Sequence, residues 1–317
     1  MLLLIKYTLL YGIVLMLVAL GGMFSEHSGI INIALEGIMV IGGVAGVLTL
    51  TMLPESLPAF ATVIIAVLAA AIAGMVYSLL LAFASINLKA DQTIGGTALN
   101  LLATAIAVVI SKYFSESGSA KLNYSNKPFL FSIGGLELSV FVPLGLILLV
   151  VSYIVLYKTR FGLRLRACGE HPQAADSVGI NVYKMRYAGT TISGALAGMG
   201  GFVYALTTAN CTANGDVAGF GFLALAVMIF GNWKPLNIAG ASLLFGLFKC
   251  IAAAYSSLDI NGDGVYWLAE IGISSHVYRM LPYLITLVVL AFTSKKSRAP
   301  KAEGIPVSYT HLRAHET

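Results

Sequence analysis

The chain has 317 residues, of which 58% are hydrophobic and 10% charged, and its mean hydropathy is +0.88. A soluble domain needs far more polar surface, so this composition excludes a soluble globular protein and indicates a polytopic membrane protein. The formal net charge of +5 does not indicate nucleic-acid binding, because most basic residues gather in a central loop and a C-terminal stretch beside apolar runs, where they fix membrane orientation.

The apolar runs predict an all-α fold. A spanning helix needs about 20 mostly apolar residues, or fewer where it is broken or shielded by protein. No stretch shows the alternation of a β-barrel, so we expect eight to ten transmembrane helices, including broken or re-entrant segments. In chain order, the predicted spans lie near Tyr7–Met23, Gly37–Leu53, Phe60–Leu88, Ile94–Ser111, Leu138–Tyr157, Tyr187–Leu206, Gly219–Phe230, Leu236–Tyr255 and Val277–Phe292.

Polar residues interrupt the apolar pattern around Ser28–Val44. Asn32 and Glu36 are four residues apart, which places them on one face of a helix. A carboxylate within a span costs roughly 2.5–3.5 kcal/mol on insertion scales, so it usually faces a cavity or a partner. Glu36 therefore either lines a permeation path or holds a hinge, or it is a helix-end carboxylate bonded to neighbouring backbone; both readings stay open.

Two further interruptions are DQTIGGTALN, at Asp91–Asn100, and TANGDVAGFGFLALAVMIFGNW, whose apolar part is short for a full crossing. Discontinuous helices often surround the substrate of a transporter, because unwound backbone is tolerated only against protein or water. Packing alone also explains the glycines, but we favour pathway lining, with aromatic rings that suit stacking on a base or sugar. The candidate substrate-pathway residues are Asn32, Glu36, Thr97, Asn100, Phe220 and Phe222.

The central loop Lys158–Arg186 holds six Lys/Arg against two acids, which places it in the cytoplasm by the positive-inside rule. Its second half is small, polar and marked by glycine, which favours a short helix across the membrane face that docks a cytoplasmic partner. Orientation of the other spans then places residues 256–275 outside and the C-terminus inside. Nine simple spans would place Lys6 outside, whereas an N-terminus inside requires an even count. We expect one re-entrant or split segment near Ser28–Val44, and the side of the N-terminus stays open.

Small residues predict close helix packing. Gly194 and Gly198 form a small-xxx-small face, and Gly42 and Gly46 form a second. We favour packing within the chain over a subunit interface. Lys249 lies in an apolar run, where we expect it to extend toward the membrane surface, with pairing to an acidic side chain such as Asp216 as the alternative.

One loop matches a calcium-binding pattern. Asp259, Asn261, Asp263, Gly264 and Glu270 fit D-x-N-x-D-G followed by five residues and Glu. The bulky apolar residues inside this loop favour simple turn formation instead. Residues 307–317 resemble one reading frame of a sequencing adapter, so we exclude them from the native fold.

Motifs for chemistry are absent from the sequence. It has no P-loop, no H-E-x-x-H, no G-x-S-x-G and no cluster of carboxylates and histidines in one loop. The three cysteines have no paired spacing. We therefore expect no enzyme activity, no cofactor and no metal site.

Five segments, in this order, resemble the permease family of bacterial ABC importers for nucleosides and simple sugars, in the branched-chain amino acid/ribose-type superfamily and nearest its nucleoside branch. They read FSEHSGIINIALEGIMVIGG, TIGGTALNLLA, TRFGLRLRACGEHPQAADSVGIN, SGALAGMGG and GFGFLALAVMIFGNWKP. The resemblance covers residues 10–306 and implies a single transmembrane permease domain over residues 1–306, in the bacterial cytoplasmic membrane.

The resemblance also implies partners. These are a cytoplasmic ABC ATPase with two nucleotide-binding domains, a second homologous permease, an extracellular substrate-binding lipoprotein and the lipid bilayer. It implies alternating access driven by that ATPase. The residues that match the ATPase-coupling loop of the family are Gly169, Glu170, Ala174, Ala175, Asp176, Gly179 and Ile180.

A different class of protein stays open as an alternative. Ion- or proton-coupled secondary transporters of small polar solutes also use broken helices and buried carboxylates. The central loop separates the two classes, because its removal should abolish energy coupling only in an ABC importer.

Overall fold

The computed structural model describes residues 2–54, 56–115, 118–124, 129–133, 136–255, 274–293 and 298–306. In this part of the chain the fold is helical, and six helices are long and apolar enough to cross a membrane. They are α1 (Leu2–His27), α2 (Leu35–Met52), α3 (Ala59–Ile86), α4 (Gln92–Phe114), α5 (Phe141–Lys158) and α10 (Pro235–Ala254). The prediction of an all-α polytopic membrane protein is confirmed.

The remaining predicted spans also coincide with helices. α8 (Val182–Thr207) has 26 residues and is more polar than its neighbours, and α12 (Ser275–Thr293) has 19. α9 (Phe220–Phe230) has only 11 residues, about 16 Å at 1.5 Å per residue, which is too short for a full crossing. Two short helices, α6 (Arg160–Glu170) and α7 (Pro172–Ser177), occupy the basic central loop, where the sequence predicts one docking helix.

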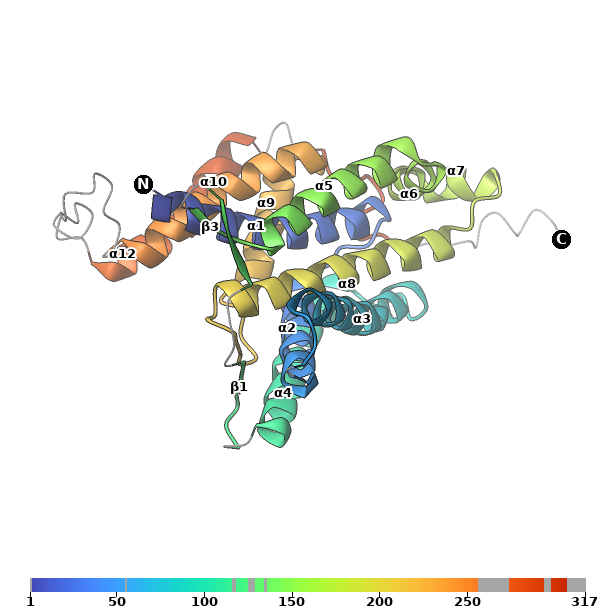
Figure 1. Ribbon diagram of the computed structural model, residues 1–317. Helices are drawn as coiled ribbons and strands as arrows, with labels where there is room; N and C mark the ends of the chain where they lie inside the picture. Colours follow the sequence, from blue (N-terminus) through green and yellow to red (C-terminus); the bar gives the residue numbers. More distant parts are fainter. Residues whose placement is uncertain are drawn as a thin grey trace.

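Short strand pairs lie away from α6 and α7, as Figure 1 shows. β1 (Leu122–Asn123) pairs antiparallel with β4 (Thr212–Ala213). β2 (Leu130–Ile133) pairs antiparallel with β3 (Leu136–Ser139). These pairs close the loops that follow α4 and α8, and they do not alter the helical architecture.

α8 packs against α1, α2 and α3, and small residues let the helices approach closely. A Cβ atom on Gly198 would lie 2.4 Å from the Ala70 carbonyl oxygen of α3, and one on Gly194 would lie 2.5 Å from that of Gly74. A Cβ atom on Gly42 of α2 would lie 2.4 Å from the backbone of Gly198. The small-residue stripes therefore serve packing within the chain, as the sequence predicts.

The chain between α1 and α2 is not helical. This segment, residues 28–34, is called the break below. Asn32 in the break bonds to Ser193, which lies near the middle of α8, so α2 starts well inside the bundle. The break is shorter than the predicted Ser28–Val44, because the small and apolar residues after Leu35 continue as regular helix.

The N-terminus and the α6–α7 loop lie at opposite ends of the bundle (Figure 1). α1 is continuous over 26 residues, and its last turn contacts α6. The side of the N-terminus, which the sequence leaves open, is therefore the end of the bundle opposite to the central loop. The calcium-type loop with Asp259 and Glu270, and residues 307–317, lie outside the described residues.

Candidate functional site

Glu36 joins the first turn of α2 to the start of α9. Its Oε1 accepts a hydrogen bond from the Gly219 amide at 2.8 Å, and its Oε2 accepts from the Gly221 and Phe222 amides at 2.6 and 3.3 Å. The first amides of a helix have no partner within the helix, so a carboxylate there satisfies donors that lipid would leave unpaired. Glu36 is thus a helix-end carboxylate bonded to backbone, and that backbone comes from a segment about 185 residues away.

Two glycines permit this close approach. Gly219 has a φ of +74°, a conformation that favours glycine. A Cβ atom on Gly221 would lie 2.4 Å from the Glu36 amide nitrogen. The glycines that interrupt the sequence before α9 are therefore needed for the contact with α2.

Asn100 of α4 bridges the end of the break and the first turn of α2. Its Oδ1 accepts from the Gly37 amide at 2.8 Å, and its Nδ2 donates to the Ile33 carbonyl at 3.0 Å. At the start of α4, the Gln92 side chain accepts from the Ile31 amide at 2.7 Å. Side chains of α4 therefore take over backbone hydrogen bonds that a continuous helix would make for itself.

Asn32 is fully buried and donates from Nδ2 to the Ser193 hydroxyl at 2.9 Å. Its Oδ1 has no hydrogen-bond partner among the residues that the structure describes. A buried unpaired acceptor costs about 1–3 kcal/mol, so the break carries an unsatisfied polar atom at its centre.

The predicted pathway residues are brought together only in part. Asn32 lies in the break and bonds to α8, so it does not share a helical face with Glu36 of α2, whereas Asn100 bonds to backbone on both sides of the start of α2. The Phe222 amide bonds to Glu36. The Phe222 ring is 49% exposed. The two remaining residues of the prediction, Thr97 and Phe220, do not contact the other four side chains through any hydrogen bond given for the described residues.

Thr97 lies on the exposed face of α4 and donates to the Thr93 carbonyl of its own helix at 2.8 Å. The Phe220 ring is only 2% exposed. It packs against Tyr11 and Tyr204, with ring centroids 6.0 and 4.9 Å away. Phe220 therefore packs the start of α9 against α1 and α8, and its ring has no open face for a solute.

Lys249 of α10, the lone lysine in an apolar run, lies at the start of α9. Its Nζ lies 4.5 Å from the centroid of the Phe220 ring and donates to the Ala218 carbonyl at 3.4 Å. Asp216 accepts from the Ala218 amide at 2.9 Å, and among the described residues it forms no ion pair with Lys249. The sequence did not indicate that Lys249 meets α9.

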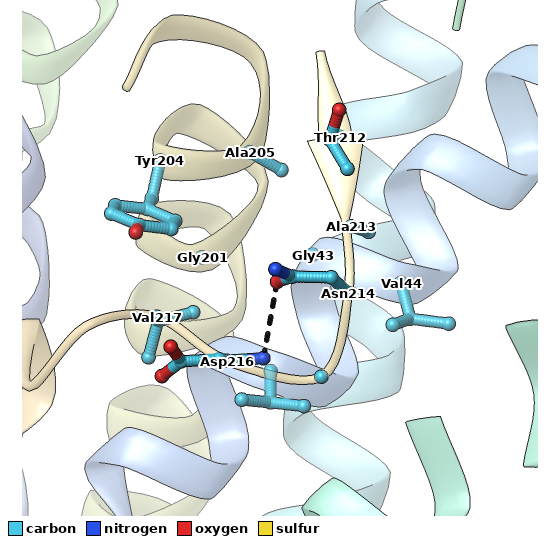
Figure 2. A pocket seen from close by; sticks show the side chains of 12 residues that line it. Gly43, Val44, Gly201, Tyr204, Ala205, Thr212, Ala213, Asn214, Asp216 and Val217 are labelled. Atoms are coloured by element: carbon cyan, nitrogen blue, oxygen red, sulfur yellow. Dashed lines mark hydrogen bonds between the residues drawn. The ribbon is translucent and has the colours of Figure 1, made fainter. Parts of the chain in front are cut away.

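A small pocket lies between α2, the C-terminal half of α8 and the loop before α9. Figure 2 shows Tyr204, Asn214 and Asp216 along it, with Gly43 and Val44 of α2 at its side. The Asp216 amide donates to the Asn214 side chain at 3.3 Å (Figure 2). The volume of this pocket is about 10 Å³, which accommodates about one water molecule, so the pocket cannot hold a sugar-sized solute.

The predicted coupling residues occupy the end of α6, all of α7 and the turn that follows. Gly169 and Ala175 are buried, because they face the bundle. A Cβ atom on Gly169 would lie 2.4 Å from the His27 carbonyl oxygen, so α6 sits directly on the last turn of α1. The other coupling residues are exposed or half-buried: Glu170, Ala174, Asp176, Gly179 and Ile180.

The exposed side of α6 and α7 also carries apolar residues. Leu163 is 63% exposed and Val178 is 74% exposed. Gly179, which follows Val178, has a φ of +81° and forms the turn back toward α8. Charged, small and apolar side chains are thus exposed on α6, on α7 and in the turn after α7.

Residues 298–306 fold back onto α6 and are called the C-terminal strap. The Ala302 amide donates to the Gly169 carbonyl at 2.8 Å, and the Gly304 amide donates to the Gly29 carbonyl of the break at 3.3 Å. The Arg186 guanidinium of α8 donates to the Ile305 carbonyl at 2.9 Å. The strap therefore links α6, the break and the start of α8, a connection that no sequence motif indicates.

The strap also places a carboxyl group near the end of α1. Glu303 lies close to Glu26, whose Oε2 accepts from the Trp233 indole nitrogen at 2.5 Å. Burial raises the pKa of the Glu303 carboxyl from 4.5 to about 7. Two carboxyl groups thus share a buried corner beside α6, and protonation of Glu303 favours its docked position.

Comparison with known proteins identifies the family. Residues 4–290 match the model of the branched-chain amino acid transport system / permease component. The chain is 39% identical to the nucleoside ABC transporter permease protein NupC of Lactococcus lactis and 39% identical to the guanosine ABC transporter permease protein NupQ of Bacillus subtilis, each over 94% of both chains.

The nucleoside ABC transporter permease protein NupB of Lactococcus lactis is 25% identical over 54% of this chain and 44% of its own length. No solved structure shows a significant match. Because the family model covers most of the described helices and two relatives match over nearly their full length, the chain belongs to the permease components of the branched-chain amino acid transport system family.

Proposed function

We propose that the chain is the transmembrane permease subunit of an ABC importer that moves nucleosides across the bacterial cytoplasmic membrane. The observation that carries this proposal is 39% identity, over 94% of both chains, to two permeases named for nucleoside and guanosine transport. The chain itself has no nucleotide-binding motif, so the energy comes from a separate ATPase.

The α6–α7 surface is the proposed ATPase contact. It is built from exposed residues that match the coupling loop of the family, such as Glu170 and Ala174, and from the exposed side chains Leu163 and Val178. The six basic residues of this loop support a cytoplasmic location for it, and because the strap packs on α6 they support a cytoplasmic strap as well.

The route of coupling runs from α6 to the break. Gly169 contacts the end of α1, and the strap bonds both to Gly169 and to Gly29. A displacement of α6 by the ATPase would therefore pull on the break, and through Glu36 on the start of α9. The unpaired Oδ1 of Asn32 supports a segment that exchanges partners between two states.

The proposed partners are a cytoplasmic ATPase with two nucleotide-binding domains, a second homologous permease and an extracellular substrate-binding lipoprotein. Similarity to NupB as well as to NupC, both from the same bacterium, supports pairing of two related permeases. The pocket of Figure 2 is too small for a nucleoside, which supports a solute chamber completed by the second permease.

Reconstitution tests the proposal. The chain is placed in lipid vesicles with its second permease, ATPase and lipoprotein, and uptake of radiolabelled guanosine is measured. We expect uptake only with ATP and all four components. Guanosine uptake driven by a proton or sodium gradient in vesicles that lack the ATPase would establish the secondary-transporter alternative instead.

A further inference from the structure

We propose that Lys249 faces the solute pathway and donates a hydrogen bond to the transported solute, with the ring of Tyr283 beside it as a stacking surface. The choice of a nucleoside as solute rests on the proposed function. The inference that Lys249 lies on a water-accessible face of the chain, called the wet face below, does not depend on the proposed function. The two parts are therefore tested separately.

Lys249 is the only charged residue in the 20 residues of α10. An ammonium has three N–H donors, and this one has a single long hydrogen bond of 3.4 Å to the Ala218 carbonyl. It has no ion-pair partner among the residues that the structure describes. At least two donors of a cation within a spanning helix are therefore free for another partner.

The nearby carboxylates already have partners. Glu36 accepts from three backbone amides of α9, and Asp216 accepts from the Ala218 amide at 2.9 Å. Neither carboxylate forms an ion pair with Lys249 among the residues that the structure describes, so the hydrogen bonds that they accept come from backbone amides.

The surroundings of Lys249 are open but not lipid-like. Asp216 is exposed, and Tyr283 and Phe222 are 46% and 49% exposed. Phe220 in this cluster stacks on Tyr11 of α1, a helix long and apolar enough to cross a membrane. An exposed carboxylate beside such a helix is expected to face water or protein, because lipid penalises it strongly.

This open face continues along α4 to the predicted pathway residues. A Cβ atom on Gly215 would lie 3.5 Å from the Thr104 carbonyl oxygen, so the loop that carries Asp216 rests on α4. Thr104 and Thr97 are both exposed and seven residues apart, which places them on one face of α4. Leu101, which is 72% exposed, lies between the two threonines, so this face of α4 is mixed polar and apolar and meets the Asp216 loop at Thr104.

The groups around Lys249 suit a flat polar solute. The Lys249 Nζ lies 4.5 Å from the centroid of the Phe220 ring and 5.5 Å from that of Tyr283. Of these two rings, Tyr283 has the open face. A nucleoside offers a ring for stacking on Tyr283, an acceptor oxygen for Lys249 and hydroxyl donors for Asp216.

Thiol labelling tests the wet face without any assumption about the solute. Lys249→Cys is compared with Leu243→Cys, a 44% exposed position on another side of the same helix, in the assembled transporter. The unsubstituted protein measures the background from Cys168, Cys211 and Cys250. Methanethiosulfonates react with thiolate, which needs water, so we expect labelling about ten-fold faster at position 249. Equal, slow labelling at both positions would overturn the proposal.

Uptake tests the contact with the solute. We expect Lys249→Met to lower guanosine uptake about ten-fold, as loss of a charged hydrogen bond does, and Lys249→Arg to restore most of it. Lys112→Met, at the end of α4, is the matched control and should transport normally. Lys249→Met should change adenosine uptake by a different factor, because adenosine has an amino group where guanosine has a carbonyl.

Thermal unfolding checks that each variant is folded. Tyr283→Ala, which removes the proposed stacking surface, is a second variant and should also lower uptake. Tyr113→Ala, at an 81% exposed position, is its control. Normal guanosine uptake by Lys249→Met, or losses for guanosine and adenosine that are equal and follow a loss of stability, would overturn the solute contact. Absence of nucleoside uptake by the unsubstituted transporter would instead overturn the proposed function, and the labelling result would still stand.

Discussion

The break and the α6–α7 loop meet their polar backbone requirements in different ways. Around the break, side chains take over backbone hydrogen bonds: Asn100 of α4 bonds to the Gly37 amide and the Ile33 carbonyl, and Glu36 of α2 bonds to amides at the start of α9. At α6–α7, the strap bonds backbone to backbone at Gly169, and one side of the loop stays exposed. The polar groups around the break are paired within the bundle, whereas the α6–α7 loop leaves an exposed surface for a partner.

This difference separates two kinds of sensitivity to mutation. Changes at the break should damage the folded permease itself, because unpaired amides within a membrane are costly. Changes at α6–α7 should leave the bundle intact and damage energy coupling. The following predictions test that separation in order of expected effect.

The largest effect is expected for Glu36→Leu. It leaves three amides at the start of α9 without an acceptor, and each unpaired buried donor costs about 1–3 kcal/mol, so destabilisation should reach about 3 kcal/mol or more. Thermal unfolding in detergent measures it. Glu170→Leu, on the exposed surface of α6, is the control, and equal melting temperatures for the two variants would contradict this role of Glu36.

Gly169→Val should abolish most ATP-driven uptake while the bundle stays folded. The first side-chain carbon would lie 2.4 Å from the His27 carbonyl oxygen, which forces α6 away from α1. Uptake and ATP hydrolysis are measured together in vesicles, and we expect hydrolysis to continue without uptake. Gly240→Val in α10, where an added Cβ atom would meet no atom within 4 Å, is the matched control and should retain both activities. Full uptake by Gly169→Val would show that this contact does not transmit motion.

Ala302→Pro should have a smaller effect. It removes the amide that donates to the Gly169 carbonyl at 2.8 Å, a loss of about 1 kcal/mol, so coupling should fall about five-fold. The ratio of solute moved to ATP hydrolysed is the measure. Ala299→Pro lies in the same strap and is exposed. An equal loss in both variants would indicate general disturbance of the strap and not the loss of this bond.

The smallest effect concerns pH. The pKa of Glu303 is raised from 4.5 to about 7 in the docked strap, so docking is strongest below pH 4.5, weakens as the pH rises toward 7 and changes little above it. Trypsin cleavage after Lys301 should therefore be a few-fold faster at pH 8 than at pH 6. Glu303→Gln stays neutral and corrects for the pH dependence of trypsin. Identical ratios for the two proteins would contradict this docking equilibrium.

The sequence predicts the helices well and their cross-connections poorly. Apolar length is a local property, so each predicted span coincides with a helix. The partner of Glu36 lies about 185 residues away, and no local spacing indicates it. Lys249 was expected to extend toward the membrane surface because its sequence does not reveal which side of α10 meets α9.

The strap was not predictable for a different reason. Its contacts to Gly169 and Gly29 are made by backbone amides, which every residue except proline carries. The basic residues of this region indicate orientation alone. Only the three-dimensional arrangement shows that the chain returns to α6 after its last helix.

The central claim is that motion of α6–α7 reaches the start of α9. Spin labels at Val178→Cys and Phe222→Cys, which are 74% and 49% exposed, report the distance between the two regions in the assembled transporter. The account predicts that the distance distribution shifts when ATP is trapped on the ATPase, and that Gly169→Val abolishes the shift. An unchanged distribution in a transporter that still moves solute would contradict it.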